Sequence, residues 1–343
     1  MKCEVENWKL KLHFPVESSL LNVGRFFRLA CKPKIGYKKA RVVKVLFFFV
    51  DGLGYRDPAP DNPVRPDVCP VLSGLMHGPD AVRIDACLGV PGLPQSATGQ
   101  ASLYTGKNAA KAMGRHQEGF PGPTLRALIE EDNIMKALCG RKLRCKFADG
   151  YVAESVPEIR TQRFKSVTTV MSLSCPDEVF FLRDDILNNR AVFHDITRES
   201  LVPRGYTGPL VTPREAADQL MQAALGHDFT LFEYFMTDIA GHTLSMADAE
   251  KTLRTLDAFL APLLEMALGT GLLFILTSDH GNIEDMGVST HTANKIPLVA
   301  RGPQAKKITR GAKSLLDVTP RLLKLFAKPA QPYGIIKRLF HRH

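Results

Sequence analysis

Short apolar runs alternate with amphipathic stretches along most of this chain. The first strong run covers residues 42–50 and is rich in β-branched and aromatic side chains, which is typical of a strand buried on both faces of a parallel sheet. Similar runs predict further strands at 142–148, 230–235, 272–277 and 296–300. Apolar residues at helical spacing predict helices at 98–112, 124–138, 213–225, 245–268 and 315–326. This alternation predicts a doubly wound α/β fold, in which helices cover both faces of a mostly parallel sheet.

The segments outside this alternation are less regular. Residues 1–41 show no clear period apart from one amphipathic helix expected at 16–30, so we treat them as an N-terminal extension of unknown role. One domain is expected over 42–330, followed by a basic tail at 331–343. Within the domain, residues 153–210 contain four prolines and short runs such as 178–182, which predict strands and loops. We interpret this stretch as a small cap or an irregular insertion.

Charge adds a preference for anionic ligands. The chain has 45 Lys and Arg against 35 Asp and Glu, a net charge of +10. Nucleic acid is the alternative partner that this charge suggests, but the basic residues are scattered, so it is not favoured. The densest basic run lies between Lys32 and Arg41, and we interpret it as a solvated arm.

Cysteine usage and hydropathy indicate the cellular compartment in which the protein is expected. Seven cysteines form no CxxC pair, so the sequence suggests neither a disulfide framework nor a structural zinc site, and a reducing compartment is expected. No stretch approaches the ~20 apolar residues of a membrane span, and charges occupy the N-terminus where a signal peptide would be apolar. We therefore predict a cytoplasmic protein without a membrane partner.

Polar residues follow three of the predicted strands. Asp51 comes directly after the run 42–50, Asp238 comes shortly after 230–235, and Asp279 with His280 follows 272–277. In an open parallel sheet, ligands bind beyond the carboxyl ends of the strands. Any one of these residues alone is better explained as a strand-ending turn or a helix cap. Three such places together favour a functional site.

The spacing of these residues suits metal binding. Asp238 and His242 are four apart, which places both on one side of a helical turn. Asp279 and His280 are adjacent, and Gly281 permits a backbone bend that lets both point at one ion. A further imidazole, His291, follows in the next segment.

Five motifs, in this order, resemble the alkaline phosphatase superfamily and, within it, the cofactor-independent phosphoglycerate mutases and phosphopentomutases. The resemblance covers about 43 to 325, and residues 1–41 lie outside it. The motifs are the strand ending in Asp51-Gly52, the segment Gln95-Ser96-Ala97-Thr98-Gly99, Asp238-xxx-His242-Thr243, Ser278-Asp279-His280-Gly281-Asn282, and His291-Thr292-xx-Asn294-xx-Pro297.

The resemblance implies a two-metal site with a serine nucleophile. One cation would be held by Asp51, Ser96, Asp279 and His280, and the other by Asp238, His242 and His291. Manganese is the first choice by resemblance to the mutases, and zinc is the second, because mixed carboxylate and imidazole ligands suit both. Ser96 would attack a small phosphorylated metabolite and form a phosphoserine intermediate. Thr98 is a rival nucleophile in the same turn, and the mutase pattern favours Ser96.

Two departures from the mutases favour hydrolysis over internal transfer. Gln100 stands where the mutases carry a histidine, and the chain leaves little room for their large cap, so water would reach a phosphoserine more easily. We therefore predict a phosphatase, with a phosphomutase as the alternative and a non-catalytic metal-binding protein as the second alternative. Arg115 and His116, in a glycine-rich loop, are candidates to clamp the substrate phosphate. The alternative is that both are solvent-exposed loop residues without a role in binding.

Overall fold

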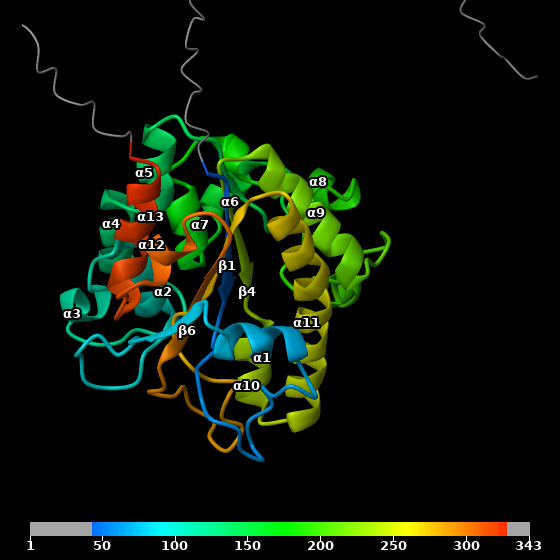
Figure 1. The fold of residues 1–343 in the computed structure, drawn as a ribbon. Helices are drawn as coiled ribbons and strands as arrows, with labels where there is room; N and C mark the ends of the chain where they lie inside the picture. Colours follow the sequence, from blue (N-terminus) through cyan, green and yellow to red (C-terminus); the bar gives the residue numbers. More distant parts are fainter. Residues whose placement is uncertain (1–42, 328–343) are drawn as a thin grey trace, which may run out of the picture. The chain divides into compact units, whose positions relative to one another are not determined.

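A six-stranded sheet forms the middle layer of the protein in the computed structural model, which describes residues 43–327 (Figure 1). The strands are β1 (Val45–Val50), β2 (Ala81–Ile84), β3 (Cys145–Phe147), β4 (Phe229–Tyr234), β5 (Leu273–Thr277) and β6 (Ile296–Arg301). Their order across the sheet is β2-β6-β5-β1-β4-β3. The pairs β5-β1, β1-β4 and β4-β3 are parallel, whereas β6 is antiparallel to both its neighbours. The predicted mostly parallel sheet is therefore confirmed.

The central strand β1 faces two hydrophobic cores. All six of its residues are buried, as the apolar run predicted. Because side chains alternate along a strand, Phe47 and Phe49 enter the core on one face, while Phe48 and Val50 enter the core on the other. Burial on both faces explains why this segment carries no polar residue before Asp51.

Helices cover both faces of the sheet, as predicted (Figure 1). One face is covered by α2 (Ser96–Thr105), α3 (Ala109–Met113), α4 (Pro123–Glu131), α5 (Ile134–Gly140), α6 (Val156–Thr161), α7 (Val167–Ser172), α12 (Ala305–Thr309) and α13 (Val318–Leu325), which follows the 3-10 helix η3 (Leu315–Asp317). The other face is covered by α1 (Pro70–His77), α9 (Pro213–Gly226), α10 (Met236–Thr243) and α11 (Met246–Gly269).

Two of the predicted helices are each broken in two. The stretch 98–112 forms α2 and α3, because Gly106 adopts a left-handed conformation (φ 71°) that ends α2, and the Asn108 side chain then caps α3. The stretch 124–138 forms α4 and α5, because Asn133 accepts a hydrogen bond from the Lys136 backbone amide and starts a new helix. In both cases a capping residue interrupts an apolar pattern that otherwise continues. The pattern also missed α1 and β2.

The irregular stretch 153–210 consists of short helices joined by loops, so the expected loops are present, whereas the expected strands are absent apart from isolated bridges at Phe181 and Val192. It contains α6, α7 and α8 (Arg183–Leu187) and the 3-10 helices η1 (Asp177–Val179) and η2 (Glu199–Arg204). The run 178–182, read as strand-like, overlaps η1. Local helix-start signals dominate here: a proline lies in the first turn of α6, and Ser166 caps α7.

Among the described residues, no helix is both long and apolar enough to cross a membrane. The helix expected at 16–30 and the tail at 331–343 lie outside the described residues, so they and the domain boundaries stay predictions.

Candidate metal centre and adjoining cavity

The carboxyl ends of β5, β1 and β4 bring the predicted metal ligands together. Asp51 directly follows β1, while Asp279 and His280 directly follow β5. The strand β4 leads into α10, which carries Asp238 and His242 on successive turns. Because these three strands are parallel neighbours, their ends meet at one edge of the sheet.

Two groups of ligand atoms share one histidine. Asp51, Asp279 and His280 each offer an atom within 4.8 Å of the others, and Asp238, His280 and His291 form a second group by the same measure. The His280 Nε2 atom lies 3.2 Å from Asp51 Oδ1 and 3.6 Å from Asp279 Oδ2. The rings of His280 and His291 stack with centroids 3.8 Å apart. His280 therefore stands between the two expected metal positions.

His242 completes the second group from the solvent side. Its Nε2 atom lies 3.1 Å from His291 Nε2 and 3.4 Å from Asp238 Oδ2. Its side chain is 44% exposed, whereas His280 is fully buried. The helical spacing of Asp238 and His242 in α10 thus brings two donors to one place.

Two buried carboxylates, Asp51 and Asp279, face one imidazole, that of His280. Asp279 is fully buried, and its Oδ2 atom accepts no hydrogen bond. Burial raises the pKa of Asp51, and burial together with the Asp51 charge raises the pKa of Asp279 well above its usual range. Although burial opposes it, the charges of Asp279 and Asp51 raise the pKa of His280 to about 10. A bound divalent cation would supply that positive charge and displace the proton, so the residues fit a metal.

Ser96 is placed to act on a ligand at this centre. It is the first residue of α2, as its sequence context predicted, and its Oγ atom lies 2.9 Å from His280 Nε2. A helix N-terminus also favours negative charge at this position. Thr98, the rival nucleophile, is fully buried; its hydroxyl donates to the Gln95 carbonyl oxygen and accepts from the Gln117 amide. Ser96 lines the adjoining cavity and Thr98 does not.

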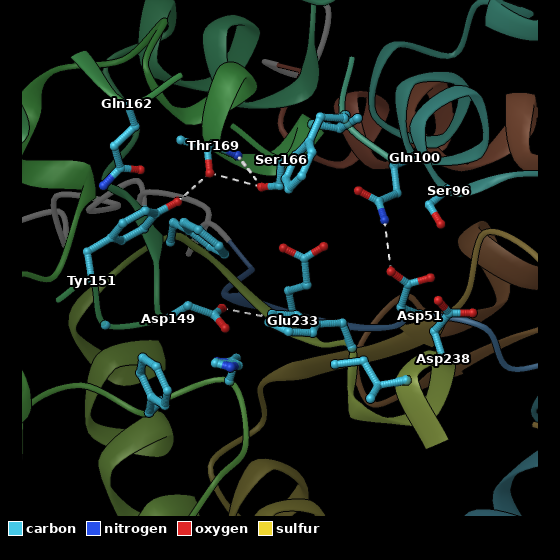
Figure 2. Close-up of a pocket in the computed structure, with 18 of the residues that line it drawn as sticks. Asp51, Ser96, Gln100, Asp149, Tyr151, Gln162, Ser166, Thr169, Glu233 and Asp238 are labelled. Atoms are coloured by element: carbon cyan, nitrogen blue, oxygen red, sulfur yellow. Dashed lines mark hydrogen bonds between the residues drawn. The ribbon is translucent and has the colours of Figure 1, made fainter. Parts of the chain in front are cut away.

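Gln100, which stands where the mutases carry histidine, contacts a predicted ligand. Its Nε2 atom donates to Asp51 Oδ2 at 3.2 Å (Figure 2). A neutral amide therefore orients the Asp51 carboxylate here.

Glu284, which the sequence reasoning missed, ties the metal-site segments together. This fully buried carboxylate accepts hydrogen bonds from the Gly54 and Asn282 amides, both 2.8 Å, through Oε2. Its Oε1 atom accepts from Thr292 Oγ1 at 2.5 Å and from Asn294 Nδ2 at 3.1 Å. It thereby joins the loops after β1 and β5 to the loop that carries His291. The signal in the sequence was its place two residues after Asn282 in the metal motif.

Replacing Glu284 by glutamine is expected to lower the free energy of unfolding by about 2–3 kcal/mol, because the new amide NH₂ must face groups that now donate to a carboxylate. Denaturant unfolding measures the change. Glu265→Gln, on the exposed side of α11, is the matched control and should stay within about 0.5 kcal/mol of the wild type. Equal stability of the two variants would contradict the role given to Glu284.

A cavity of about 580 Å³ adjoins the metal centre (Figure 2). Asp51, Ser96 and Asp238 lie at one end of it. The opposite wall comes largely from the stretch 150–169, with Tyr151 and Gln162 farthest from the metal ligands in Figure 2. The volume falls in the range of small-ligand sites. The cavity is therefore open to Ser96 and walled in part by the stretch that we read as a small cap.

Two further carboxyl groups, Asp149 and Glu233, line the middle of this cavity. Asp149 Oδ2 accepts the Glu233 backbone amide at 2.9 Å. Burial, helped by the Asp51 charge, raises the pKa of Glu233 to about 8, and burial raises the pKa of Asp149 well above its usual range. Our sequence analysis named neither residue. Asp149 follows strand β3, so the rule that found Asp51 would have found it too.

The pKa of Glu233 predicts a pH effect on stability. Between its unfolded value of 4.5 and about 8, the folded chain holds a proton that the unfolded chain has lost, so Glu233 lowers stability as pH rises, by up to about 1.4 kcal/mol per pH unit. In chelator-treated protein, the stabilising effect of Glu233→Gln relative to wild type should therefore grow from pH 5 to pH 8. Urea unfolding at several pH values measures it, and a constant difference would contradict the prediction.

Arg115 and His116 do not line this cavity. They lie along a second hollow of about 660 Å³, together with Gln95, which precedes Ser96. The Arg115 side chain is exposed, and His116 Nε2 lies 3.2 Å from the Val90 carbonyl oxygen. Their role in clamping a phosphate stays a prediction.

The site and sheet define an α/β protein with two adjacent metal-ligand groups, and comparison with known proteins gives its family. The chain matches the profile of the Metalloenzyme superfamily over residues 43–330 and belongs to that superfamily. This is the alkaline phosphatase-like group of metal-dependent phosphoryl-transfer enzymes, so membership implies divalent metal ions. The family and the fold class expected from the motifs are therefore confirmed.

Similar proteins include curated mutases that are much longer than the matched region. The 2,3-bisphosphoglycerate-independent phosphoglycerate mutase of Desulforudis audaxviator is 30% identical over 137 residues, which is 38% of this chain and 27% of that protein. The mutase of the same name from Methylobacillus flagellatus is 29% identical over 133 residues, or 36% of this chain and 26% of that protein. The chain thus spans about a quarter of the length of these relatives.

A solved structure supports the fold. A cold-active alkaline phosphatase from Shewanella sp. superimposes with a TM-score of 0.51 at 11% identity, covering 83% of this chain and 100% of that one. At this identity the likeness concerns the fold alone.

Proposed function

We propose that this protein is a two-metal phosphatase that hydrolyses a small phosphate monoester through a phosphoserine at Ser96. The observation that carries the proposal is the position of the Ser96 hydroxyl, 2.9 Å from His280 at the start of α2 and open to the cavity. Two divalent cations, manganese first and zinc second, would lower the pKa of the serine hydroxyl and neutralise the charge of the phosphoryl group. The residues that would hold them are Asp51, Ser96, Asp279 and His280 for one, and Asp238, His242 and His291 for the other.

The reaction then proceeds in two displacements. In the first, Ser96 Oγ loses its proton to solvent and bonds to phosphorus, while the bond from phosphorus to the substrate oxygen breaks and the alcohol leaves with a proton from solvent. The N-terminus of α2 stabilises negative charge at Ser96 in both steps. In the second, a water molecule attacks the phosphoserine, and inorganic phosphate leaves as the serine hydroxyl forms again.

A phosphomutase is the second candidate, and the names of the similar proteins favour it. A mutase must keep water from the phosphoserine, and the wall formed by residues 150–169 shields only part of the cavity. The small phosphorylated substrate and the cytoplasmic location also belong to this proposal. A non-catalytic metal-binding role is disfavoured by the retention of the serine beside a complete ligand set.

The cavity argues against phosphoglycerate as the substrate of either reaction. A second anionic group would need a cationic side chain, and Arg204, at the exposed rim, is the single Arg or Lys among the described residues that line the cavity. The imidazole of His194 does not supply a charge, because burial lowers its pKa to about 4. The remaining polar lining consists of carboxyl, hydroxyl and amide groups.

Product analysis separates the two candidates. The manganese-loaded protein is incubated with para-nitrophenyl phosphate, pentose phosphates and 3-phosphoglycerate, and both inorganic phosphate and isomerised esters are measured. We expect phosphate release from the first two kinds of ester and little turnover of 3-phosphoglycerate. Isomerised ester without free phosphate would instead establish the mutase, and absence of any turnover would favour the non-catalytic alternative.

A further inference from the structure

Three cysteines, two of them six residues apart and the third 30 residues further on, gather on one side of the sheet. Cys139 lies near the end of α5, Cys145 begins β3, and Cys175 follows α7. The Sγ atoms of Cys139 and Cys175 are 2.7 Å apart, so a covalent bond of about 2.05 Å requires a shift of less than ~1 Å. Cys175 and Cys145 are buried, while Cys139 is half-buried and reachable by a small reagent.

The surrounding contacts hold the thiols of Cys139 and Cys175 close to each other. Asn133, the cap of α5, donates from Nδ2 to Ser174 Oγ at 3.1 Å, which anchors the residue before Cys175 to the start of the helix that carries Cys139. Hydrogen bonds from the neighbouring thiols of Cys145 and Cys175 also lower the pKa of Cys139, whereas the pKa of Cys175 is raised. Cys139 is thus the thiol that most readily becomes the attacking thiolate.

We infer that Cys139 and Cys175 form a reversible disulfide that responds to low-molecular-weight disulfides such as oxidised glutathione. The Cys139 thiolate attacks one sulfur of the reagent, whose other sulfur leaves as a thiolate. The Cys175 thiolate then attacks Cys139 in this mixed disulfide and expels the second thiolate. Two electrons pass from the protein to the reagent, and the two protein thiols lose their protons to the two thiolates released.

The loop that this bond closes carries the substrate wall of the cavity. Residues 139–175 include the cavity-lining side chains of Phe147, Asp149, Tyr151, Gln162, Ser166 and Thr169. Within this wall the Tyr151 hydroxyl and Thr169 Oγ1 lie 2.6 Å apart, and Thr169 also contacts Ser166 (Figure 2). None of the seven predicted metal-site residues lies in this loop. Oxidation should therefore alter substrate binding and leave the metal chemistry intact.

Peptide mapping tests the bond directly, because trypsin separates the three cysteines into peptides 137–141, 145–146 and 166–183. The full-length, metal-loaded protein is treated with oxidised glutathione, alkylated and digested. We expect a linked pair of peptides 137–141 and 166–183 that disappears after treatment with dithiothreitol. The same link should be absent in Cys175→Ser and Cys175→Ala, and retained in the control Cys87→Ser, whose thiol lies elsewhere. Full alkylation of both peptides, or a link between 137–141 and 145–146, would overturn the inference.

A kinetic measurement tests the effect on the cavity, and this part rests on the proposed function. Oxidation of the wild type should change the KM for para-nitrophenyl phosphate by roughly threefold or more with little change in kcat, and Cys175→Ser should show no change. A disulfide with unchanged KM would overturn the link to the cavity. If neither redox state turns over substrate, the proposed function fails, while the peptide map still decides whether the bond forms.

Discussion

Replacing Ser96 by alanine is expected to lower kcat/KM for para-nitrophenyl phosphate by about 1000-fold or more, because the substitution removes the atom that bonds to phosphorus. Such a loss corresponds to about 4 kcal/mol of transition-state stabilisation. The variant should keep its fold, since alanine is tolerated at the first position of a helix and the hydrogen bond of Ser96 Oγ is to His280, not to the core of the sheet.

The comparison needs two further variants. Ser73→Ala, in α1 on the opposite face of the sheet, controls for a serine-to-alanine change and should retain wild-type turnover. Thr98→Val removes the rival hydroxyl. Because the Thr98 hydroxyl accepts a hydrogen bond from the loop at Gln117, this variant should be less stable than the wild type but should still form a phosphoenzyme. Undiminished turnover by Ser96→Ala, measured after removal of contaminating phosphatases, would contradict the assignment.

Replacing His280 by alanine is expected to remove metal from both expected metal positions. His242→Ala should weaken metal binding at only one of them. His280 contributes to both ligand groups, while His242 adjoins only Asp238 and His291. We therefore expect His280→Ala to be inactive at every metal concentration. His242→Ala should regain activity in excess manganese, with the half-saturating concentration raised roughly tenfold or more.

Metal analysis by mass spectrometry gives the stoichiometry of each variant after dialysis. His227→Ala, which removes an imidazole beyond the end of α9, is the matched control and should bind metal as the wild type does. If His280→Ala and His242→Ala lost the same amount of metal, the shared position of His280 would be contradicted.

The positions of the candidate metal-site residues could be inferred from the sequence because they follow strand ends and helix starts. Because β1 and β5 are parallel neighbours, the polar residues that follow their apolar runs fall at the same edge of the sheet. Helical spacing was enough to place Asp238 and His242 on one side of a helix, and the helix that follows Ser96 was enough to place Ser96 at its N-terminus. These positions depend on local pattern and on one topological rule.

The features that were missed depend on contacts between distant segments. The helix breaks at Gly106 and Asn133 come from capping residues, which the spacing of apolar residues does not reveal. Glu284 is recognised only when the loops that donate to it come together. The contact between Cys139 and Cys175 joins residues 36 apart, so counting cysteines in the sequence could not show it. The expected strand at 178–182 was wrong, because the run begins inside η1 and only Phe181 pairs with another segment, in an isolated bridge to Gly150.

Trapping the covalent intermediate tests the central claim most directly. The manganese-loaded enzyme is mixed with a ³²P-labelled phosphate monoester, quenched in acid while turnover proceeds, and digested for peptide sequencing by mass spectrometry. The proposed mechanism predicts label on Ser96, and its loss when unlabelled substrate is added before the quench. Label on Thr98, or steady phosphate release with no labelled peptide at any time of quenching, would contradict it.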